Sequence, residues 1–458
     1  MRIRIINACL CVRCSARWLF PVIAMACFAS IAVAQTAAPD LPTEGLKDPG
    51  VRGGVAGAGG SFSGLTANQL EYFTDGQVRF QEIEDVPNNG LGPRFNLNQC
   101  SGCHAQPAVG GSSPKSNPQV NGNVAPANQV NNLVSLHLID ANGPIREIRF
   151  PSDGGVHDLF TITGLPGAPA GCQISQPNFA QHLSQGDLIF RIPTPTFGAG
   201  LIEAIADETI LANQNATKPF GITGHVNRNG NDGTITRFGW KAQNKSLQIF
   251  SGEAYNVEMG ISNELFQQER GEAGTPDPAV CRTIATPNDK TNFDSTTTTG
   301  VLNDVSGFSD FMRFLDQPAP ACQVNVNCSN SINRGSALFQ QVGCATCHTP
   351  SMQSDTHPVA ALSNQTANLF SDLLVHNMGQ LGDGVTQGSA GPNEFRTAPL
   401  WGLGQRVFFL HDGRTSDLLQ AIDAHALTGQ SEAFQVIQNF NALNNPQQQD
   451  ILSFLRSL

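Results

Sequence analysis

One short pattern occurs twice in the chain: residues 100–104 are Cys-Ser-Gly-Cys-His, and residues 344–348 are Cys-Ala-Thr-Cys-His. Two cysteines three positions apart on one helical turn can bond to both vinyl groups of one haem, and the histidine that follows can then bind its iron. A zinc site or a disulfide uses similar spacing, but zinc needs further Cys or His ligands nearby, and neither motif has them. The pattern therefore predicts two covalently attached c-type haems, with these attachment and iron-binding residues: Cys100, Cys103, His104, Cys344, Cys347 and His348.

The first 34 residues have the composition of a secretory signal peptide. A basic start, from Arg2 to Arg17, contains no acidic residue, and the apolar run over residues 18–34 ends in Ala-Val-Ala. A membrane anchor is the alternative, but Pro21 interrupts the run, which is short for a bilayer span. We therefore expect cleavage near Ala34, a periplasmic protein and no membrane span in the mature chain.

Loss of this segment leaves a strongly acidic chain. The segment carries four arginines and no acidic residue, so 22 basic residues remain against 37 acidic ones. Such a surface repels nucleic acid and steers basic proteins toward it. We expect no nucleic-acid partner and, for a haem protein, a small periplasmic electron donor such as a cytochrome c or a cupredoxin.

Four cysteines lie outside both motifs and the signal segment: Cys172, Cys281, Cys322 and Cys328. The export route is oxidising, so two disulfides are expected, with three pairings open. Cys322–Cys328 would close a short Asn-rich loop, and Cys172–Cys281 would follow by elimination. The alternative is four unpaired thiols.

The periodicity of apolar residues predicts a mainly α fold with two cytochrome c-like haem domains. Helices are expected before each motif, over residues 65–80 and 336–342, and also over residues 308–315, 417–427 and 446–458. Residues 134–138 and 145–150 alternate like strands, which predicts a β-containing insertion in the N-terminal domain. The predicted organisation is a signal peptide (1–34), a flexible lead-in (35–64), an N-terminal haem domain (65–325) with the insertion at about 120–236, and a C-terminal haem domain (330–458).

His425 is the strongest candidate for a sixth iron ligand. Leu418, Ile422 and His425 are spaced i, i+4 and i+7, so they share one apolar face of the predicted helix. An inward histidine can also be a hydrogen-bonded core residue, but a haem must be buried nearby. We therefore predict His425 opposite His348 on the second iron, whereas the sixth ligand of the first iron stays open.

Several longer stretches resemble the di-haem cytochrome c peroxidases, and in detail the branch called di-haem oxidoreductases or thiol oxidoreductases. The stretches are residues 193–205, 237–242, 371–379, 395–403 and 409–414. In related peroxidases a ligand to the electron-donating haem lies fourteen residues after the His of a His-x-Gly motif, and His411 plus fourteen is His425. His376 and Met378 are the fallback ligands, from a motif that the family keeps near this haem.

The resemblance also implies roles for two further residues and one ion. Trp240 stands where these enzymes place a tryptophan between the haems, and ordinary core packing is the alternative. Glu258 resembles the acid/base glutamate over the peroxide-binding haem, with a surface or capping role as the alternative. The family holds a calcium ion between its domains, which is an expectation here without a recognisable ligand cluster.

The resemblance favours reduction of hydrogen peroxide at the haem of His104, with electrons supplied through the haem of His348. Phe250 stands where the peroxidases have a glutamine, so an oxidase or oxygenase acting on an organic or protein substrate is the first rival, and a pure electron carrier is the second. Glu203 is the other acid/base candidate, because it lies in an apolar run where an unpaired carboxylate is costly. Its alternative role is that of a buried partner for Arg191 or Arg237.

Overall fold

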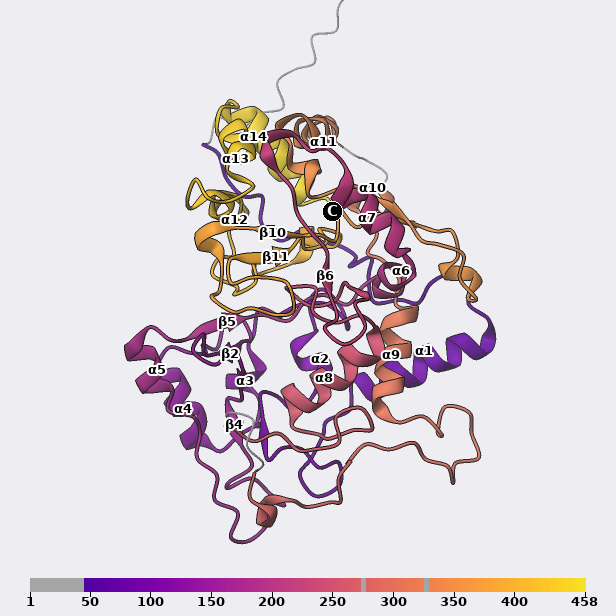
Figure 1. Ribbon diagram of the computed structural model, residues 1–458, viewed down its shortest axis with the longest axis vertical. Coiled ribbons are helices and arrows are strands. Elements are labelled where there is room, and N and C mark those ends of the chain that lie inside the picture. The colour runs from indigo at the N-terminus through magenta and orange to yellow at the C-terminus, as the bar shows by residue number, and fades with distance from the viewer. Residues whose placement is uncertain (1–44, 273–276, 325–328) are drawn as a thin grey trace, which may run out of the picture. The chain divides into compact units, whose positions relative to one another are not determined.

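Helix α1 (Ala67–Phe80) forms where the sequence predicts it and packs along α9 (Asp304–Phe314). Thr66 caps its first turn through its side chain. Gly76 allows the close approach, because a Cβ atom there would lie 2.2 Å from the carbonyl oxygen of Gly307 on α9. Phe80, the last residue of α1, meets the ring of His104 in the first Cys-x-x-Cys-His motif edge to face, with the centroids 5.9 Å apart, and α1 lies beside α9 in Figure 1.

The computed structural model describes residues 45–272, 277–324 and 329–458. The α-helices besides α1 and α9 are α2 (Cys100–Cys103), α3 (Pro118–Asn121), α4 (Ala127–Ser135), α5 (Phe179–Gln185), α6 (Ala199–Ala204), α7 (Asp207–Asn215), α8 (Leu247–Met259), α10 (Ala321–Val324), α11 (Asn330–Val342), α12 (Leu418–Asp423), α13 (Phe434–Asn441) and α14 (Asn445–Leu455). The 3-10 helices are η1 (Pro219–Gly221), η3 (Ala279–Cys281), η4 (Cys344–Thr346), η5 (Ala360–Leu362), η6 (Gly379–Leu381), η7 (Leu403–Gln405) and η8 (Ala424–Ala426).

The strands are short and every pair among them is antiparallel. One sheet has the order β3 (Val156–His157), β2 (Glu147–Arg149), β5 (Ile189–Arg191). The two-stranded sheets are β1 (Arg94–Phe95) with β4 (Phe160–Thr161), β6 (Asn227–Arg228) with β7 (Ile235–Thr236), β8 (Met352–Gln353) with β9 (Thr366–Ala367), and β10 (Val375–Asn377) with β11 (Glu394–Arg396).

The fold class is therefore mixed: helix accounts for 35% of the structure and strand for 9%. The predicted insertion does contain β structure, but β8 to β11 lie beyond residue 330, so strands are not confined to it. The predicted strand over residues 134–138 is wrong, because residues up to Ser135 belong to α4. Leu133 points into the core from this helix, and His137 turns the chain with a positive φ of 55°.

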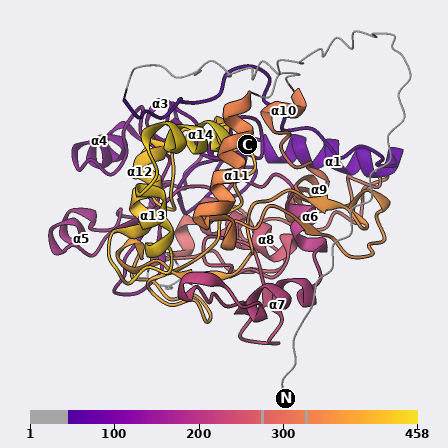
Figure 2. The same ribbon diagram turned by 90° about the horizontal axis from the view of Figure 1, so that it is seen from above.

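The predicted boundary near residue 325 does not separate two cores. Buried residues from the second half, including Met352, Leu374 and Trp401, join the larger hydrophobic core with α1, α8 and α9. A smaller core lies between α11, α12, α13 and α14, which gather round one another in Figure 2. Residues 45–458 accordingly form one compact unit.

Residues 45–64 are held in place, in contrast to the flexible lead-in that their composition predicts. The Asp48 carboxylate is buried against the Arg456 guanidinium, at 2.5 Å, and accepts the backbone N–H of Leu418 at the start of α12. Further along, the carbonyl of Gly57 accepts the N–H of Ala319. Buried charge pairing and backbone hydrogen bonds therefore fix a segment that lacks apolar periodicity.

Three predictions depend on export: the disulfides, the signal peptide and the absence of a membrane span in the mature chain. Cys172 and Cys281 form a disulfide, and Cys322 is also disulfide-bonded, whereas Cys328 lies outside the described residues. The predicted signal peptide over residues 1–34 also lies outside them. Within the described ranges, no helix combines the length and the apolarity that a bilayer span requires.

Candidate functional site

The first motif opens onto a cavity with about 1090 Å³ of empty space. Cys100, Cys103 and His104 all line it, and neither thiol is in a disulfide. Nδ1 of His104 donates to the carbonyl oxygen of Gly111 (3.0 Å). Burial lowers the pKa of His104 to about 4, so the ring is neutral and able to bind a metal.

A polar wall faces this cavity from α8 and from the three-stranded sheet. Glu258, in the last turn of α8, lines the cavity, and its Oε2 accepts a hydrogen bond from Nδ2 of Asn96 (3.1 Å). Three residues that sequence reasoning missed line the same wall: Glu147, Arg149 and Arg191. Burial raises the pKa of Glu258 well above its ordinary value, and the Glu147 carboxylate raises it further.

The lining of the first cavity contains no histidine besides His104. Phe250, which replaces the glutamine of related peroxidases, does line it. Its ring stacks on Phe238 with the centroids 6.1 Å apart. The cavity therefore combines a single imidazole with a carboxyl group and one added apolar surface.

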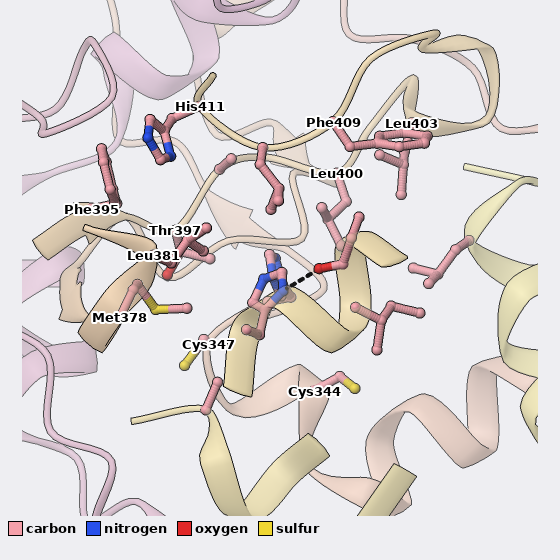
Figure 3. A pocket seen from close by; sticks show the side chains of 18 of the residues that line it. Cys344, Cys347, Met378, Leu381, Phe395, Thr397, Leu400, Leu403, Phe409 and His411 are labelled. Carbon is pink, nitrogen blue, oxygen red and sulfur yellow. Dashed lines mark hydrogen bonds between the residues drawn. The ribbon is translucent and has the colours of Figure 1, made fainter. Parts of the chain in front are cut away.

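The second motif opens onto a larger cavity, with about 1500 Å³ of empty space (Figure 3). His348 and His425 both line it, and the centroids of their rings are 6.5 Å apart. Nδ1 of His348 donates to the carbonyl of Phe370 (3.0 Å), and Nδ1 of His425 donates to that of Ala421 (2.8 Å). Both Nε2 atoms are thus left for a metal, with the outer hydrogen bond that metal-binding histidines typically make.

Two buried guanidinium groups line the second cavity: those of Arg396 and Arg406. Burial lowers the pKa of each to about 10, and Nη1 of Arg396 has no hydrogen-bond partner. Arg396 donates to the backbone carbonyl of Gly239, and Arg406 donates to that of Pro399. A haem carries two propionate carboxylates, so these arginines fit a haem better than an uncharged ligand.

Trp240 lines both cavities. Its Nε1 donates to the carbonyl of Ile192 (2.8 Å), which fixes the ring between the two sites. Ile192 and Pro193 also line both cavities. Trp240 is thus common to the lining of both cavities, and its role between two haems stays a prediction.

The fallback ligand His376 is fully engaged by carboxylates. Its Nε2 pairs with Asp372 (3.0 Å) and its Nδ1 with Glu432 (2.9 Å), and Lys218 also pairs with Asp372 (2.8 Å). Carboxylates only accept hydrogen bonds, so both ring nitrogens carry protons, and the pKa of His376 is raised well above its ordinary value despite its burial. A protonated imidazole has no free lone pair for iron.

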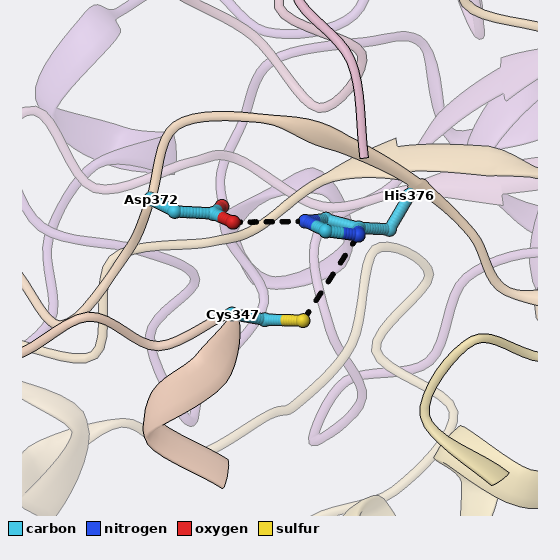
Figure 4. A group of neighbouring side chains, drawn as sticks. All are labelled: Cys347, Asp372 and His376. Atoms are coloured by element: carbon cyan, nitrogen blue, oxygen red, sulfur yellow. Dashed lines mark hydrogen bonds and ion pairs between the residues drawn. The ribbon is translucent and has the colours of Figure 1, made fainter. Parts of the chain in front are cut away.

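The same network bears on the zinc alternative for the second motif. Cys347, Asp372 and His376 place three potential ligand atoms within 4.8 Å of one another (Figure 4). Both ring nitrogens of His376 are paired with carboxylates, and Asp372 is also paired with Lys218, so the cluster forms an ion-pair network. It is also the single such cluster in the part of the chain that the structure describes, and its ligand set does not suit calcium. Met378 lines the second cavity, so it stays the fallback ligand.

Glu203 lines neither cavity. Its Oε1 accepts a hydrogen bond from the backbone N–H of Leu247 at the start of α8 (2.9 Å), and its Oε2 accepts one from Nε of Arg313 (2.9 Å). The alternative of an arginine partner thus fits, with Arg313 in place of Arg191 or Arg237. We assign Glu203 to the structural support of α8.

Two cavities, each beside a Cys-x-x-Cys-His motif and sharing one tryptophan, are the arrangement expected of a redox protein with two haems. The model of the family described as "Di-haem oxidoreductase, putative peroxidase" matches residues 154–458. The match covers two thirds of the chain, and the chain therefore belongs to this family, whose cofactor is haem. Residues 100–104 precede the match, so the first attachment site rests on its own spacing and cavity.

Solved structures resemble the chain only distantly. A MauG-like protein associated with microbial copper homeostasis has 15% identity and a TM-score of 0.31, over 58% of this chain and 90% of that one. Hydrazine synthase from Kuenenia stuttgartiensis has 12% identity and a TM-score of 0.33, over 93% and 99%. The dihaem peroxidase BthA from Burkholderia thailandensis has 14% identity and a TM-score of 0.28, over 56% and 77%. Similarity at this level carries no information on the activity, and no curated protein matches the chain.

Proposed function

We propose that this protein is a periplasmic di-haem c-type peroxidase. It reduces hydrogen peroxide to water in the cavity of His104, with electrons that enter through the cavity of His348 and His425. The observation that carries this proposal is the asymmetry of the two cavities. One is lined by a single imidazole, of His104, together with the carboxyl group of Glu258. The other is lined by four histidines, among which the rings of His348 and His425 lie 6.5 Å apart, and Trp240 borders both.

Haem, when bound in the first cavity, supplies the iron that binds peroxide and the electrons that cleave its O–O bond. Glu258 then acts as the proton carrier. Its carboxylate accepts the proton of bound peroxide and, as the acid, returns it to the departing oxygen. Asn96 holds the Oε2 atom of Glu258, so the carboxyl group is fixed in orientation over the cavity. Phe250 keeps water away from one side.

The second cavity suits electron storage. Two imidazole ligands favour a six-coordinate, low-spin iron, which leaves no position for peroxide. Trp240 then provides the route to the first cavity, and its hydrogen bond to Ile192 keeps the ring in one orientation. The acidic mature chain favours a small basic electron donor, and a calcium ion between the two haem regions stays an expectation from the family.

A second function is favoured by one observation. Phe250 lines the first cavity where related peroxidases have a glutamine, so the cavity is more apolar than theirs on that side. An oxidase or oxygenase that acts on an organic or protein substrate would use such a surface to bind that substrate. A pure electron carrier is less well supported, because the first cavity offers no second histidine.

Steady-state turnover with peroxide, using a reduced small cytochrome as the donor, tests the proposal. We expect turnover together with a high-spin band in the oxidised spectrum, which reports an open iron position. Trp240→Phe should keep both haems and the high-spin band but slow the electron supply. Absence of turnover with a high-spin band would favour the oxidase. Absence of the band in every redox state would favour the carrier.

A further inference from the structure

The sheet of the insertion delivers three charged side chains to the first cavity. In the β2–β5 ladder Glu147 lies opposite Arg191, and Arg149 lies opposite Ile189. Glu147 and Arg149 are two positions apart on one strand, so their side chains leave the same face. All three charged residues line the cavity in which Glu258 lies. The β insertion therefore supplies part of the wall that faces the first motif.

Glu147 is hydrogen bonded to Glu258. Two ionised carboxylates only accept hydrogen bonds, so a bond between them requires that the pair hold one proton. Arg149 donates its Nε to Oε1 of Glu147 at 2.5 Å, whereas Arg191 is paired with the buried carboxylate of Asp383. The guanidinium of Arg149 thus favours the ionised form of Glu147, and the shared proton resides on Glu258.

The electrostatics of the pair agree with this arrangement. Burial alone would raise the pKa of Glu147, but the Arg149 and Arg191 guanidiniums lower it overall. Burial raises the pKa of Glu258, and the negative charge of Glu147 adds to the effect. The charged or titratable groups that face the pair are Arg149 on β2, Arg191 on β5, Glu253 on α8, Asp158 between β3 and β4, and Cys103 on α2.

We propose that Glu147 is a positioning residue for acid–base chemistry in the first cavity, because it shares one proton with Glu258 and sets the pH at which the pair can accept a second one. In the resting state the pair holds one proton and one negative charge. When a protic ligand of the iron, such as peroxide or hydrogen cyanide, loses its proton, the pair takes it and becomes neutral. The O–H or C–H electron pair stays with the bound anion, and in peroxide cleavage the proton returns to the departing oxygen. This role deepens the proposed function and rests on it for the physiological reaction.

Cyanide binding to the oxidised protein tests the pair without any redox step. Hydrogen cyanide must lose a proton to bind as cyanide, so its association rate, followed in the visible spectrum, reports the state of the carboxyl pair against pH. In the resting pair Glu147 is the ionised member, so Glu147→Gln leaves Glu258 as the sole acceptor. Burial raises the pKa of Glu258, whereas the guanidiniums lower that of Glu147, so the midpoint of the pH profile should move up by about one unit or more. Glu147→Asp keeps the charge near Arg149 but shortens the side chain and weakens that contact, so it should move the midpoint up by less.

Glu71→Gln is the control, because Glu71 is exposed on α1, does not line the cavity and is not among the charged groups that face the pair. Its midpoint should equal that of the wild type. Retention of both haems checks folding in each variant, and Glu147→Asp serves if Glu147→Gln fails to fold. Unchanged midpoints in the Glu147 variants would overturn the inference. A shifted midpoint in a protein without peroxide turnover would refute the peroxidase function and leave the carboxyl pair standing.

Discussion

The two cavities begin from the same five-residue motif and differ in what stands across from it. In the first cavity His104 is the sole imidazole, and carboxyl groups and guanidiniums form the opposite wall. In the second, His425 stands across from His348, and the rest of the wall is mainly apolar. In the proposed function the motif sets where a haem would be attached, and the elements that fold over it would decide whether the iron is open to a small molecule or closed by a second ligand.

The charges of the two cavities differ in the same sense. The first cavity has two ion pairs beside it, Arg149 with Glu147 and Arg191 with Asp383. Arg396 and Arg406 at the second cavity donate to backbone carbonyl groups instead of carboxylates. Buried guanidiniums without counter-charges are costly unless an anion joins them. The second cavity thus offers the positive charge of two arginines to an anionic cofactor. In the first cavity, by our proposal, the Glu147–Glu258 pair can take up and release a proton.

The largest expected effect separates the two attachment sites. Cys344→Ala combined with Cys347→Ala should leave one covalent haem, and Cys100→Ala with Cys103→Ala should leave the other, because each thiol pair serves one cavity. Intact mass spectrometry of the denatured protein measures the number of haems that remain. Cys172→Ser with Cys281→Ser removes a cysteine pair outside both cavities and should keep two. Zinc, or no covalent haem in the wild type, would remove the basis of the comparison.

The next effect concerns the chemistry of the first cavity alone. Glu258→Gln should lower peroxide turnover by about a hundredfold or more, since positioned acid–base groups contribute roughly that much, while both haems stay attached. Glu203→Gln is its control, because Glu203 supports α8 from outside the cavity. Steady-state rates with a reduced cytochrome measure both. Near-normal turnover in Glu258→Gln with loss in Glu203→Gln would exchange their roles.

The candidate site could be predicted where local sequence decides it. The Cys-x-x-Cys-His runs are contiguous, and the inward direction of His425 follows from helical spacing, so neither depends on distant contacts. Trp240 and Glu258 came from the family resemblance, and both line the cavities that the resemblance implies. The helices around α1, α9 and α14 were predictable for the same local reasons.

The missed residues are those that long-range pairing brings in. Arg191 reaches the first cavity because β5 pairs with β2, across more than forty positions of sequence. A signal did exist: Glu147 and Arg149 are charged residues on one face of a predicted strand, which is unusual for a buried sheet. The error over residues 134–138 has the opposite cause, because a short alternation there coincided with a helical end. The segment around Asp48 is fixed by charge pairing, which periodicity cannot detect.

A smaller effect tests what closes the second cavity. His425→Ala should convert one low-spin haem to high spin and shift its potential by an amount on the order of 0.1 V, since axial ligands set haem potentials. Optical and electron paramagnetic resonance spectra measure the spin state, and redox titration the potential. Met378→Ala is the control and should leave the spectrum unchanged. An unchanged spectrum in His425→Ala together with an altered spectrum in Met378→Ala would make Met378 the ligand and leave His425 as a hydrogen-bonded core residue.

The smallest effect on function concerns how the second cavity is held together. Asp48 bonds to Arg456 near the end of α14 and caps the start of α12, which leads to His425. Asp48→Asn leaves a buried guanidinium without its counter-charge, which should lower the free energy of unfolding by about 3 kcal/mol and leave peroxide turnover near normal. Asp232→Asn, in an exposed pair with Lys245, is the control and should cost less.

The pH dependence of this last effect has a defined sign. Burial would raise the pKa of Asp48, but the Arg456 guanidinium and the backbone donors of Gly50 and Leu418 lower it below its ordinary value of 3.8. A carboxyl group with a lowered folded pKa stabilises the fold above its unfolded pKa, and this stabilisation is lost as pH falls through the folded value. Denaturant unfolding of wild type and Asp48→Asn should therefore differ by a constant amount near neutral pH, and the difference should shrink below about pH 4. A constant difference down to pH 2 would mean that packing, not charge, holds residues 45–64 against α12 and α14.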